Sequence, residues 1–142
     1  GIFVPFFGRL ASTYKSIGLL AMRYELPLVV TMAERLDGRF KYRIMIQDII
    51  EPEDWADQPD PLYYITARYI HGIECMIRRA PEQYLWMHRR WKSRPRHERQ
   101  GKDMPQMLED QIRSLPWLSA SESQAVIDRS NEESLQNRKP DR

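Results

Sequence analysis

The chain has 142 residues, of which 42% are hydrophobic and 30% charged, and its formal net charge is +2. These values are ordinary for one soluble globular domain and exclude a fibrous or wholly disordered protein. The longest apolar run, residues 26–33, falls short of the roughly 20 residues that a membrane-spanning helix needs. The single cysteine, Cys75, excludes an internal disulfide.

Charge is unevenly distributed along the chain. Residues 68–99 hold nine Arg and Lys against three Glu, a net charge of +6, whereas residues 1–67 and 100–142 each have a net charge of −2. A basic region of this kind attracts phosphate groups, whether they belong to nucleic acid or to anionic lipid. Charge alone leaves both partners open.

The first third of the chain predicts a strand, a helix and a second strand. The chain opens at Gly1 without an initiator methionine or a visible signal peptide, so we expect a piece of a longer protein. Residues 2–7 are aromatic and β-branched, which predicts a strand, and residues 14–25 carry apolar side chains at helical spacing. The continuous apolar run 28–33 predicts a strand buried on both faces, so the three elements together form a βαβ unit.

A hairpin is expected next. The pair Asp37-Gly38 lies between two strand-like runs, and residues 40–47 alternate between apolar and polar side chains. An Asp-Gly pair in that position is a strong signal for a tight turn, so the second run adds an antiparallel edge strand. The pattern predicts an α/β fold with a mixed sheet flanked by helices.

The second half is predicted to be helical and then disordered. After Asp60-Pro61, apolar residues recur every three or four positions and predict a long amphipathic helix that Pro81 ends. Residues 82–91 can form one more short helix, and residues 105–115 another. Residues 119–142 are rich in Ser, Glu, Asn and Gln, and this composition predicts a disordered tail.

Common enzyme motifs are missing from the sequence. It contains no CxxC, HExxH, GxSxG, GxGxxG or Walker pattern. The histidines, His71, His88 and His97, are too scattered to suggest a metal site, so we expect neither a metal nor a cofactor. Cys75 lies near His71 without an activating context, which argues against a catalytic pair.

The block PEQYLWMHRRWKSRP, residues 81–95, combines aromatic and basic side chains. Such a block can stack on bases while contacting phosphates, or lie at a membrane interface with its arginines on lipid headgroups. It can equally be structural, with Trp86 and Trp91 packing a short helix onto the domain and the arginines solvated. Composition does not separate these alternatives.

The same block, with Thr66-Ala67-Arg68-Tyr69 and Ile77-Arg78-Arg79-Ala80 before it, closely resembles the C-terminal signature of the bacterial lipid A biosynthesis acyltransferases. These belong to the lysophospholipid acyltransferase superfamily. The opening GIFVPFFGR and the following Ala11-Ser12-Thr13 are similar to the family segment "GvFVdFFGrpAsT". The resemblance covers residues 1–95, with Pro5 in place of a common Asp and Ile70 in place of an expected Asn.

The resemblance implies that residues 1–95 are the C-terminal part of the acyltransferase core, residues 96–118 a partly helical extension, and residues 119–142 the disordered tail. Members of the family use a histidine in an HxxxxD/E motif as general base, with the carboxylate orienting the imidazole. No histidine here has an acid five positions later; those positions are Met76, Ser93 and Lys102. The motif is therefore expected upstream of Gly1, no catalytic residue is assigned, and the chain alone is expected to be inactive.

The family activity implied is transfer of a fatty acyl group from acyl carrier protein or acyl-CoA to a hydroxyl of a lipid A precursor or related glycolipid. The acceptor could instead be a lysophospholipid or another glycolipid. The alternative from another class is a small basic nucleic-acid-binding module built on residues 68–99. The resemblance places the protein at the cytoplasmic face of the bacterial inner membrane, in peripheral contact with the membrane surface and with no nucleic acid partner.

Eight residues are expected to contact substrate or membrane by this resemblance. Near the cleft, the side chains of Phe6 and Phe7 with Gly8 would shape an acyl-chain wall, or the two rings could simply be core. Arg9 would contact a phosphate, although a solvated arginine is the more common case. The remaining four are expected to contact lipid phosphates: Arg89, Arg90, Lys92 and Arg94.

Overall fold

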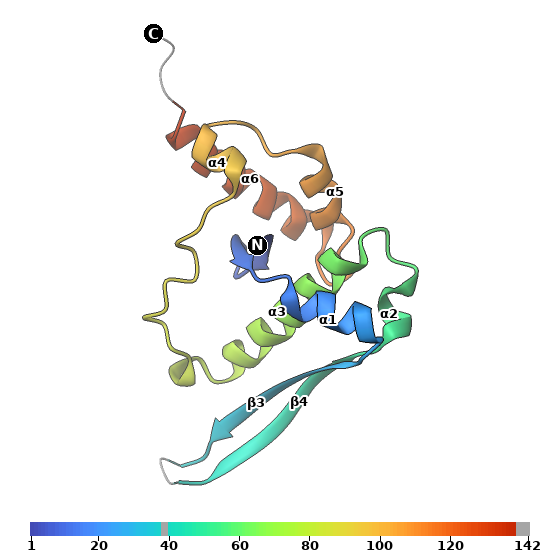
Figure 1. Cartoon of the computed structure of the whole chain (residues 1–142). Helices are drawn as coiled ribbons and strands as arrows, with labels where there is room; N and C mark the ends of the chain where they lie inside the picture. The colour runs from blue at the N-terminus through green and yellow to red at the C-terminus, as the bar shows by residue number, and fades with distance from the viewer. Residues whose placement is uncertain (38–39, 139–142) are drawn as a thin grey trace. The chain divides into compact units, whose positions relative to one another are not determined.

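The computed structural model describes residues 1–37 and 40–138, and its helices and small antiparallel sheets place the protein in the α/β class (Figure 1). The chain divides into two compact units. Residues 1–14 and residue 90 onward form the first unit, and residues 15–89 form the second. The segment expected to be one part of an acyltransferase core, residues 1–95, is thus shared between both units.

The first unit begins with a tight hairpin. Strands β1 (Ile2–Phe6) and β2 (Arg9–Thr13) pair antiparallel, with Phe6 opposite Arg9, so Phe7 and Gly8 form a two-residue turn. Both turn residues have positive φ, +51° and +69°, as the turns that match the twist of a hairpin require. Since β1 pairs with β2 and lies in a different sheet from β3, the predicted βαβ unit is wrong.

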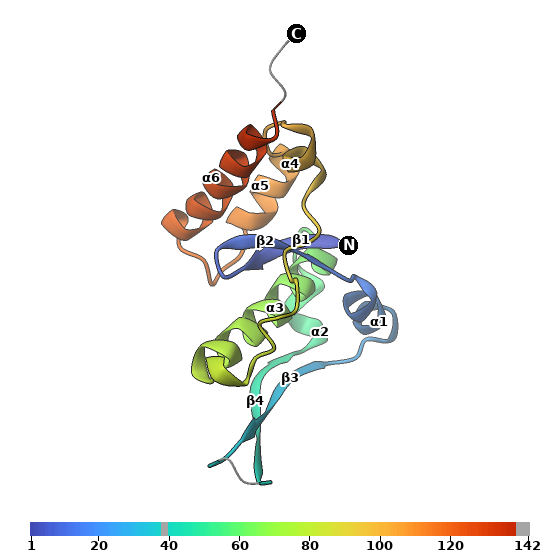
Figure 2. The same cartoon turned by 90° about the vertical axis from the view of Figure 1, so that its left-hand side faces the viewer.

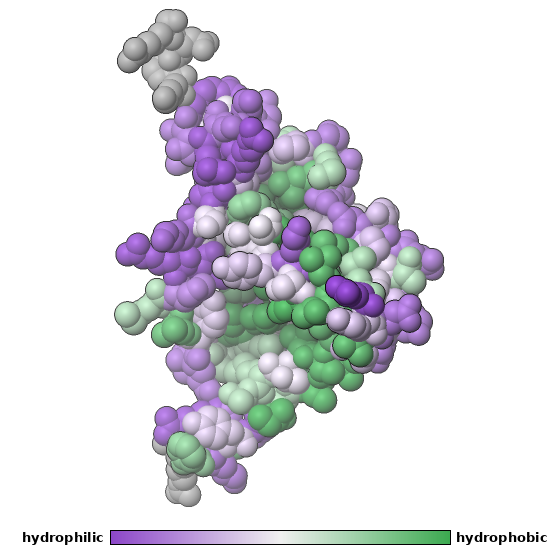
Figure 3. Space-filling model, in the orientation of Figure 1, coloured by the Kyte–Doolittle hydropathy of each residue, from purple (hydrophilic) through white to green (hydrophobic). Residues whose placement is uncertain are grey.

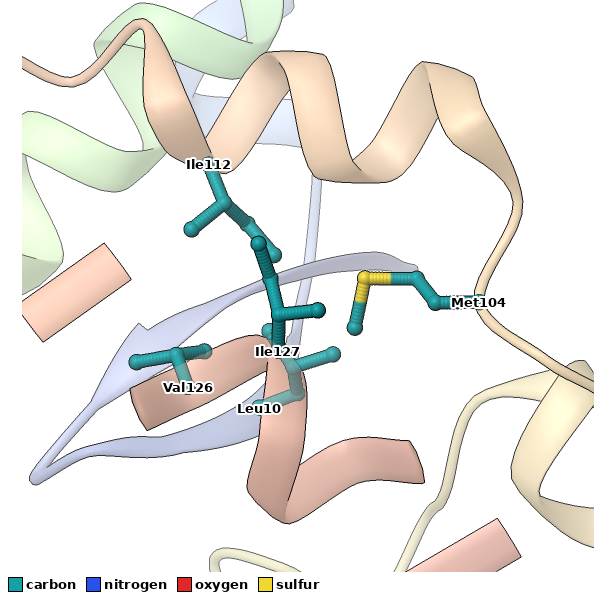
Figure 4. Packing of buried hydrophobic residues seen from close by; sticks show 5 residues of the cluster. All are labelled: Leu10, Met104, Ile112, Val126 and Ile127. Atoms are coloured by element: carbon teal, nitrogen blue, oxygen red, sulfur yellow. The ribbon is translucent and has the colours of Figure 1, made fainter. Parts of the chain in front are cut away.

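Three helices complete the first unit: α4 (Arg96–Gln100), α5 (Gln106–Arg113) and α6 (Ala120–Gln136). They lie beside the β1–β2 hairpin (Figure 2). Figure 4 shows Leu10 of β2 within a buried apolar cluster. The other members of the cluster are Met104, Ile112, Val126 and Ile127. The predicted helix over residues 105–115 is confirmed, with slightly shorter bounds.

Helix α6 corrects the prediction of a disordered tail. Ser119 caps it, because the Ser119 hydroxyl accepts a hydrogen bond from the Glu122 backbone N–H (3.1 Å) and the Glu122 carboxylate accepts one from the Ser119 N–H (2.8 Å). The buried positions are Ser123, Val126, Ile127, Ser130 and Ser134. This spacing is one face of a helix. Residues 139–142 of the predicted tail lie outside the described residues.

The second unit packs a long helix on a two-stranded sheet. Its elements are α1 (Ser16–Tyr24), β3 (Leu28–Arg35), β4 (Tyr42–Ile50), α2 (Pro52–Ala56), α3 (Pro61–Arg79) and the 3-10 helix η1 (Pro81–Gln83). The long helix starts where the sequence predicts, because the Asp60 carboxylate accepts a hydrogen bond from the Tyr63 N–H (2.9 Å) and Pro61 follows it. At Gly72 a Cβ would lie 3.1 Å from Val30 of β3, so this glycine lets helix and sheet approach closely.

The antiparallel pairing of β3 with β4 confirms the predicted hairpin, although Gly38 of its turn lies outside the described residues. The expectation that β3 is buried on both faces is wrong: Val30 is buried, while its neighbours Val29 and Thr31 are exposed. Residues 82–91 do not form the predicted helix either. Only η1 is helical there, and turns and bends lead onward to residue 95.

Apolar side chains of the second unit reach its surface. On the face drawn in Figure 3, hydrophobic residues gather over α1. They include Ile17, Leu19 and Leu20, all of which are exposed. The face of the β3–β4 hairpin opposite α3 is also apolar, since Ile44 and Ile46 are 70% and 63% exposed. Patches of this kind usually mark surfaces that another partner covers.

Candidate functional site

The four substrate-contacting candidates lie together at the β1–β2 turn, in two environments. Phe6 is only 1% exposed and forms an edge-to-face contact with Phe7 (4.8 Å between ring centroids). On the signature block, the ring of Trp91 lies 5.7 Å from that of Phe6. Phe6 is therefore part of the core. Phe7 is partly exposed and Gly8 is exposed, so these two form the accessible part of the turn.

Arg9 is held by a carboxylate of α6. Its Nη2 donates a hydrogen bond to Glu133 Oε2 (3.0 Å), and its Nε lies 2.7 Å from Glu133 Oε1 as an ion pair without hydrogen-bond alignment. Burial acts to raise the pKa of Glu133, but the hydrogen bond from Arg9 and the charges of Arg94, Arg9 and Arg129 outweigh it and lower the pKa. Glu133 is therefore ionised at neutral pH and pairs with the Arg9 guanidinium at the turn.

Arg90 and Arg94 of the signature block are bound by protein groups of the first unit. Arg90 donates hydrogen bonds to the Ser12 carbonyl and to Thr13 Oγ1 (2.7 Å for the latter), and its guanidinium lies over the Phe6 ring at 5.4 Å. Arg94 makes a bidentate pair with Glu98 (2.8 and 2.9 Å). Arg94 also donates to the Leu10 carbonyl and to Glu133, at 2.6 Å each. Both arginines therefore bind strand β2 and connect it to the signature block.

A buried polar chain extends from Arg94. Glu98 is 1% exposed, and its Oε1 accepts a hydrogen bond from Ser130 Oγ (2.5 Å). His97 Nε2 lies 2.9 Å from the same hydroxyl. The Ser130 hydroxyl donates its hydrogen bond to Glu98, so it accepts one from His97. A nucleophilic serine needs the opposite arrangement, in which its hydroxyl donates to the histidine. Burial lowers the pKa of His97, Arg94 lowers it further and Glu98 opposes both.

The other two basic candidates, Arg89 and Lys92, are exposed. Arg89 belongs to the second unit and Lys92 to the first. The structure therefore divides the four basic candidates into two with protein partners and two that face solvent. A phosphate can approach the exposed side chains of Arg89 and Lys92 directly, whereas at Arg90 and Arg94 it would have to displace protein groups.

The start of the signature block has a role that sequence reasoning missed. The side-chain amide of Gln83 accepts a hydrogen bond from the Arg35 N–H (2.8 Å) and donates one to the Arg35 carbonyl (3.0 Å). Trp86 Nε1 donates to the Pro81 carbonyl (2.6 Å), and the Trp86 ring meets Tyr84 edge-to-face at 4.9 Å. No motif signalled Gln83 or Glu133, because their partners lie 48 and 124 residues away in the chain.

Cys75 and His71 are neighbours on α3, with Sγ 3.6 Å from Nε2. Burial raises the pKa of the Cys75 thiol, and Glu74 adds to the effect. The thiol is therefore protonated at neutral pH, whereas a nucleophilic cysteine needs the thiolate. Within residues 1–37 and 40–138, no three His, Cys, Asp or Glu side chains gather at metal-binding distance.

Comparison with known proteins identifies the family. The model of the "Bacterial lipid A biosynthesis acyltransferase" family matches residues 1–93, and the chain belongs to that family. Two curated relatives are each 38% identical over 96 residues: the "Lipid A biosynthesis palmitoleoyltransferase" of Escherichia coli strain K12 and the "Lipid A biosynthesis acyltransferase" of Shigella flexneri. The match covers 66% of this chain but 29% of each relative. No solved structure matches.

Family membership confirms the resemblance seen in the sequence. The matched segment ends just before Arg94, so α4, α5 and α6 lie outside it. The partners that hold Arg9 and Arg94 by their side chains, Glu98 and Glu133, both come from this extension.

Proposed function

We propose that the chain is the C-terminal part of an acyltransferase that moves a fatty acyl group from acyl carrier protein or acyl-CoA to a hydroxyl of a lipid A precursor or related glycolipid. The family match over residues 1–93 carries this proposal. The two relatives named above, whose names describe lipid A biosynthesis, support it in the same region. Their matched part is under a third of their length, so the remaining steps of the activity are assigned to polypeptide beyond this chain.

The β1–β2 turn is the proposed substrate contact. Phe7 and Gly8 supply an accessible apolar edge, with Phe6 as its buried base. Arg9 lies at the same turn, with its guanidinium oriented by Glu133. An apolar wall beside a fixed cation suits a molecule with a fatty chain and a phosphate.

The chemical step is proposed to depend on a histidine outside this chain. Acyl transfer to a hydroxyl needs a general base to take the hydroxyl proton as it attacks the thioester carbonyl. None of the histidines in this sequence is followed by an acid at the family spacing. His97 is buried, and its Nε2 is hydrogen-bonded to the Ser130 hydroxyl. The proposed role of this chain is to shape the acceptor side of the site.

Membrane contact at the cytoplasmic face of the inner membrane is part of the proposal. Of the basic candidates, Arg89 and Lys92 are exposed and are proposed to meet lipid phosphates, whereas Arg90 and Arg94 are proposed to hold β2. Over the described parts of the chain, none of the helices has the length and apolar character to cross a bilayer.

The test is a transfer assay on two proteins. One is the 142-residue chain, and the other is the product of its gene together with the in-frame upstream DNA. We expect the longer protein to transfer a radiolabelled acyl group from acyl carrier protein or acyl-CoA to a lipid A precursor, and the 142-residue chain to transfer none. A lysophospholipid acceptor, run in parallel, tests the alternative acceptor. Turnover by the short chain, or a folded longer protein without turnover on either acceptor, contradicts the proposal.

A further inference from the structure

One carboxylate of α6 has three guanidinium groups around it, all within the first unit. Glu133 pairs with Arg9 (2.7 Å between Nε and Oε1) and with Arg94 (2.6 Å between Nη2 and Oε2). Arg129, four residues before Glu133 on the same helix, brings its Nε to 3.5 Å from Oε1. Arg9 and Arg129 therefore meet at the same oxygen, although Arg9 comes from the segment that matches the family and Arg129 from the extension.

This cluster carries more positive than negative charge. In the described part of the chain, the one other carboxylate that pairs with these arginines is Glu98, the partner of Arg94. Three guanidinium groups thus share two carboxylates, which leaves a surplus of one positive charge. Like charges held this close repel one another, and a bound anion would remove the repulsion.

Two of the three arginines keep hydrogen-bond donors for a ligand. Arg94 does not, because it already binds Glu98 through two donors and the Leu10 carbonyl through a third. Arg129 is 49% exposed, and none of its donors has a hydrogen-bond acceptor among the described residues. Of the side-chain nitrogens of Arg9, only Nη2 is hydrogen-bonded within the same residues. An external acceptor can therefore meet Arg9 and Arg129 together.

A phosphate group fits this pair of cations. A phosphate monoester carries a charge of about −1.5 to −2 at pH 7, and its oxygens accept from several directions, so two guanidinium groups can donate to it. A carboxylate brings a single charge and binds one guanidinium edge in its plane, so it fits the pair less well. The turn itself is open: a Cβ at Gly8, next to Arg9, would have no atom within 4 Å apart from its chain neighbours.

We propose that Arg9 and Arg129 form a composite phosphate site, in which the C-terminal extension supplies the second cation. Glu133 lies between the two guanidinium groups and orients them. The inference rests on the proposed function, because a phosphorylated glycolipid acceptor is the molecule that brings a phosphate to the β1–β2 turn. The same donors would hold free phosphate, which the experiment separates. Arg129 lies outside residues 1–93, so the family match does not assign it.

Titration of the 142-residue chain, followed by the Nε–H signals of its arginines in NMR spectra, tests the site directly. Glucosyl phosphate should shift the signals of Arg9 and Arg129 together, whereas glucose should shift neither. Inorganic phosphate is titrated in parallel to identify the source. Tighter binding of the sugar ester supports a lipid headgroup, and tighter binding of the free ion supports inorganic phosphate as the ligand. Signals of Arg9 and Arg129 that move with neither probe overturn the proposal.

Substitution of the second cation gives a sharper measurement. Arg129→Gln should weaken the binding of glucosyl phosphate by roughly 10-fold, the effect of losing one charged hydrogen bond. Arg129→Lys should recover part of this loss, because the charge remains. Since Arg129 is half exposed and makes no hydrogen bond among the described residues, neither variant should change the thermal unfolding midpoint.

The matched control is Arg113→Gln on α5. Arg113 is similarly exposed and pairs with Glu109, four residues before it (3.9 Å), but no second guanidinium meets that carboxylate in the described parts of the chain. This variant loses the same charge from the same unit and should bind glucosyl phosphate as the parent does. Equal weakening by Arg129→Gln and Arg113→Gln overturns the proposal in favour of a general charge effect.

The longer protein separates this inference from the proposed function. There Arg129→Gln should raise KM for a phosphorylated acceptor by roughly 10-fold, with a smaller change for the same acceptor after its phosphate is removed. Binding to the 142-residue chain is read without any transfer assay. Acyl transfer with a KM that Arg129→Gln leaves unchanged refutes the composite site alone. Phosphate binding at Arg9 and Arg129 in a longer protein without transfer refutes the activity alone.

Discussion

Two tryptophans of one signature block have different environments. Trp86 is 53% exposed, and its indole N–H is satisfied by the Pro81 carbonyl. Trp91 is partly buried against Phe6, and its indole nitrogen is buried without a hydrogen-bond partner among the described residues. Sequence patterns give both residues the same anchoring role, whereas the contacts give the larger share of stability to Trp91.

We expect Trp91→Ala to lower the free energy of unfolding by about 2–4 kcal/mol, because it removes an indole packed on the core and leaves a cavity. Trp86→Ala should cost about 1 kcal/mol, since half of that ring is already in solvent. Trp91→Phe is the control: it keeps an aromatic ring on the core and deletes the unpaired N–H with the smaller part of the indole, so it should cost less than Trp91→Ala. Urea unfolding measures all three, and equal losses for the two alanine variants would contradict this assignment.

At the scale of elements, helix α6 is joined to the β1–β2 hairpin by one carboxylate. Glu133 bridges Arg9 of β2 and Arg94, and Arg94 also binds the Leu10 carbonyl. The apolar cluster around Leu10 supplies packing, but it is not directional. The ion pairs are directional, so they set how α6 lies on the hairpin and how the Arg9 guanidinium is held at the turn.

We expect Glu133→Gln to lower the free energy of unfolding at pH 7 by about 1–3 kcal/mol, because the guanidinium of Arg9 loses its counter-charge and that of Arg94 keeps only Glu98. The lowered pKa of Glu133 means that its stabilisation is complete above the ordinary glutamate pKa of about 4.3 and is lost as the pH falls through the lower folded value. The gap between parent and variant should therefore close in acid. The control is Glu132→Gln, at the exposed residue next to Glu133, and we expect this variant to unfold with the same free energy as the parent at every pH.

Sequence reasoning predicted the α3 helix and the β3–β4 hairpin because local signals define both: a cap with proline, and alternating side chains around a turn. It missed α6 because the inward face of that helix is mostly serine, a residue counted toward disorder. The spacing of Ser123, Ser130 and Ser134, together with the capping box at Ser119, was the available signal. Two of these serines have hydrogen-bond partners across the unit: Ser130 donates to Glu98 and accepts from His97, and Ser134 donates to the Lys102 carbonyl.

The candidate site was predicted only in part for a similar reason. The family segment located Phe6 through Arg9 and the basic block, which are contiguous in sequence. Pairings over long separations, such as Glu133 with Arg9 or Gln83 with Arg35, have no local pattern. The βαβ prediction failed because a two-residue turn at Phe7-Gly8 folds β1 back onto β2, and the strand run alone does not reveal its partner.

At the scale of the whole molecule, the distribution of charge fits two partners, anionic lipid and nucleic acid, and experiment must separate them. The +6 charge of residues 68–99 suits anionic lipid or nucleic acid alike. Carboxylates from outside this region neutralise part of it, since Arg68 pairs with Asp48 and Asp54, and Arg94 pairs with Glu133. What remains for an external phosphate includes the exposed Arg89 and Lys92.

We expect the 142-residue chain to bind vesicles that contain anionic phospholipid and to prefer them over a single-stranded oligonucleotide at the same ionic strength. The double substitution Arg89→Gln and Lys92→Gln should weaken vesicle binding by up to roughly 30-fold, at about 1 kcal/mol for each cation near the surface. The matched control is Lys15→Gln with Arg23→Gln, which removes the same charge from exposed positions outside the basic region. Co-sedimentation at several salt concentrations measures the binding. Equal loss in both double variants, or tight and steeply salt-dependent oligonucleotide binding without vesicle binding, would favour a general cation effect or the nucleic-acid module instead.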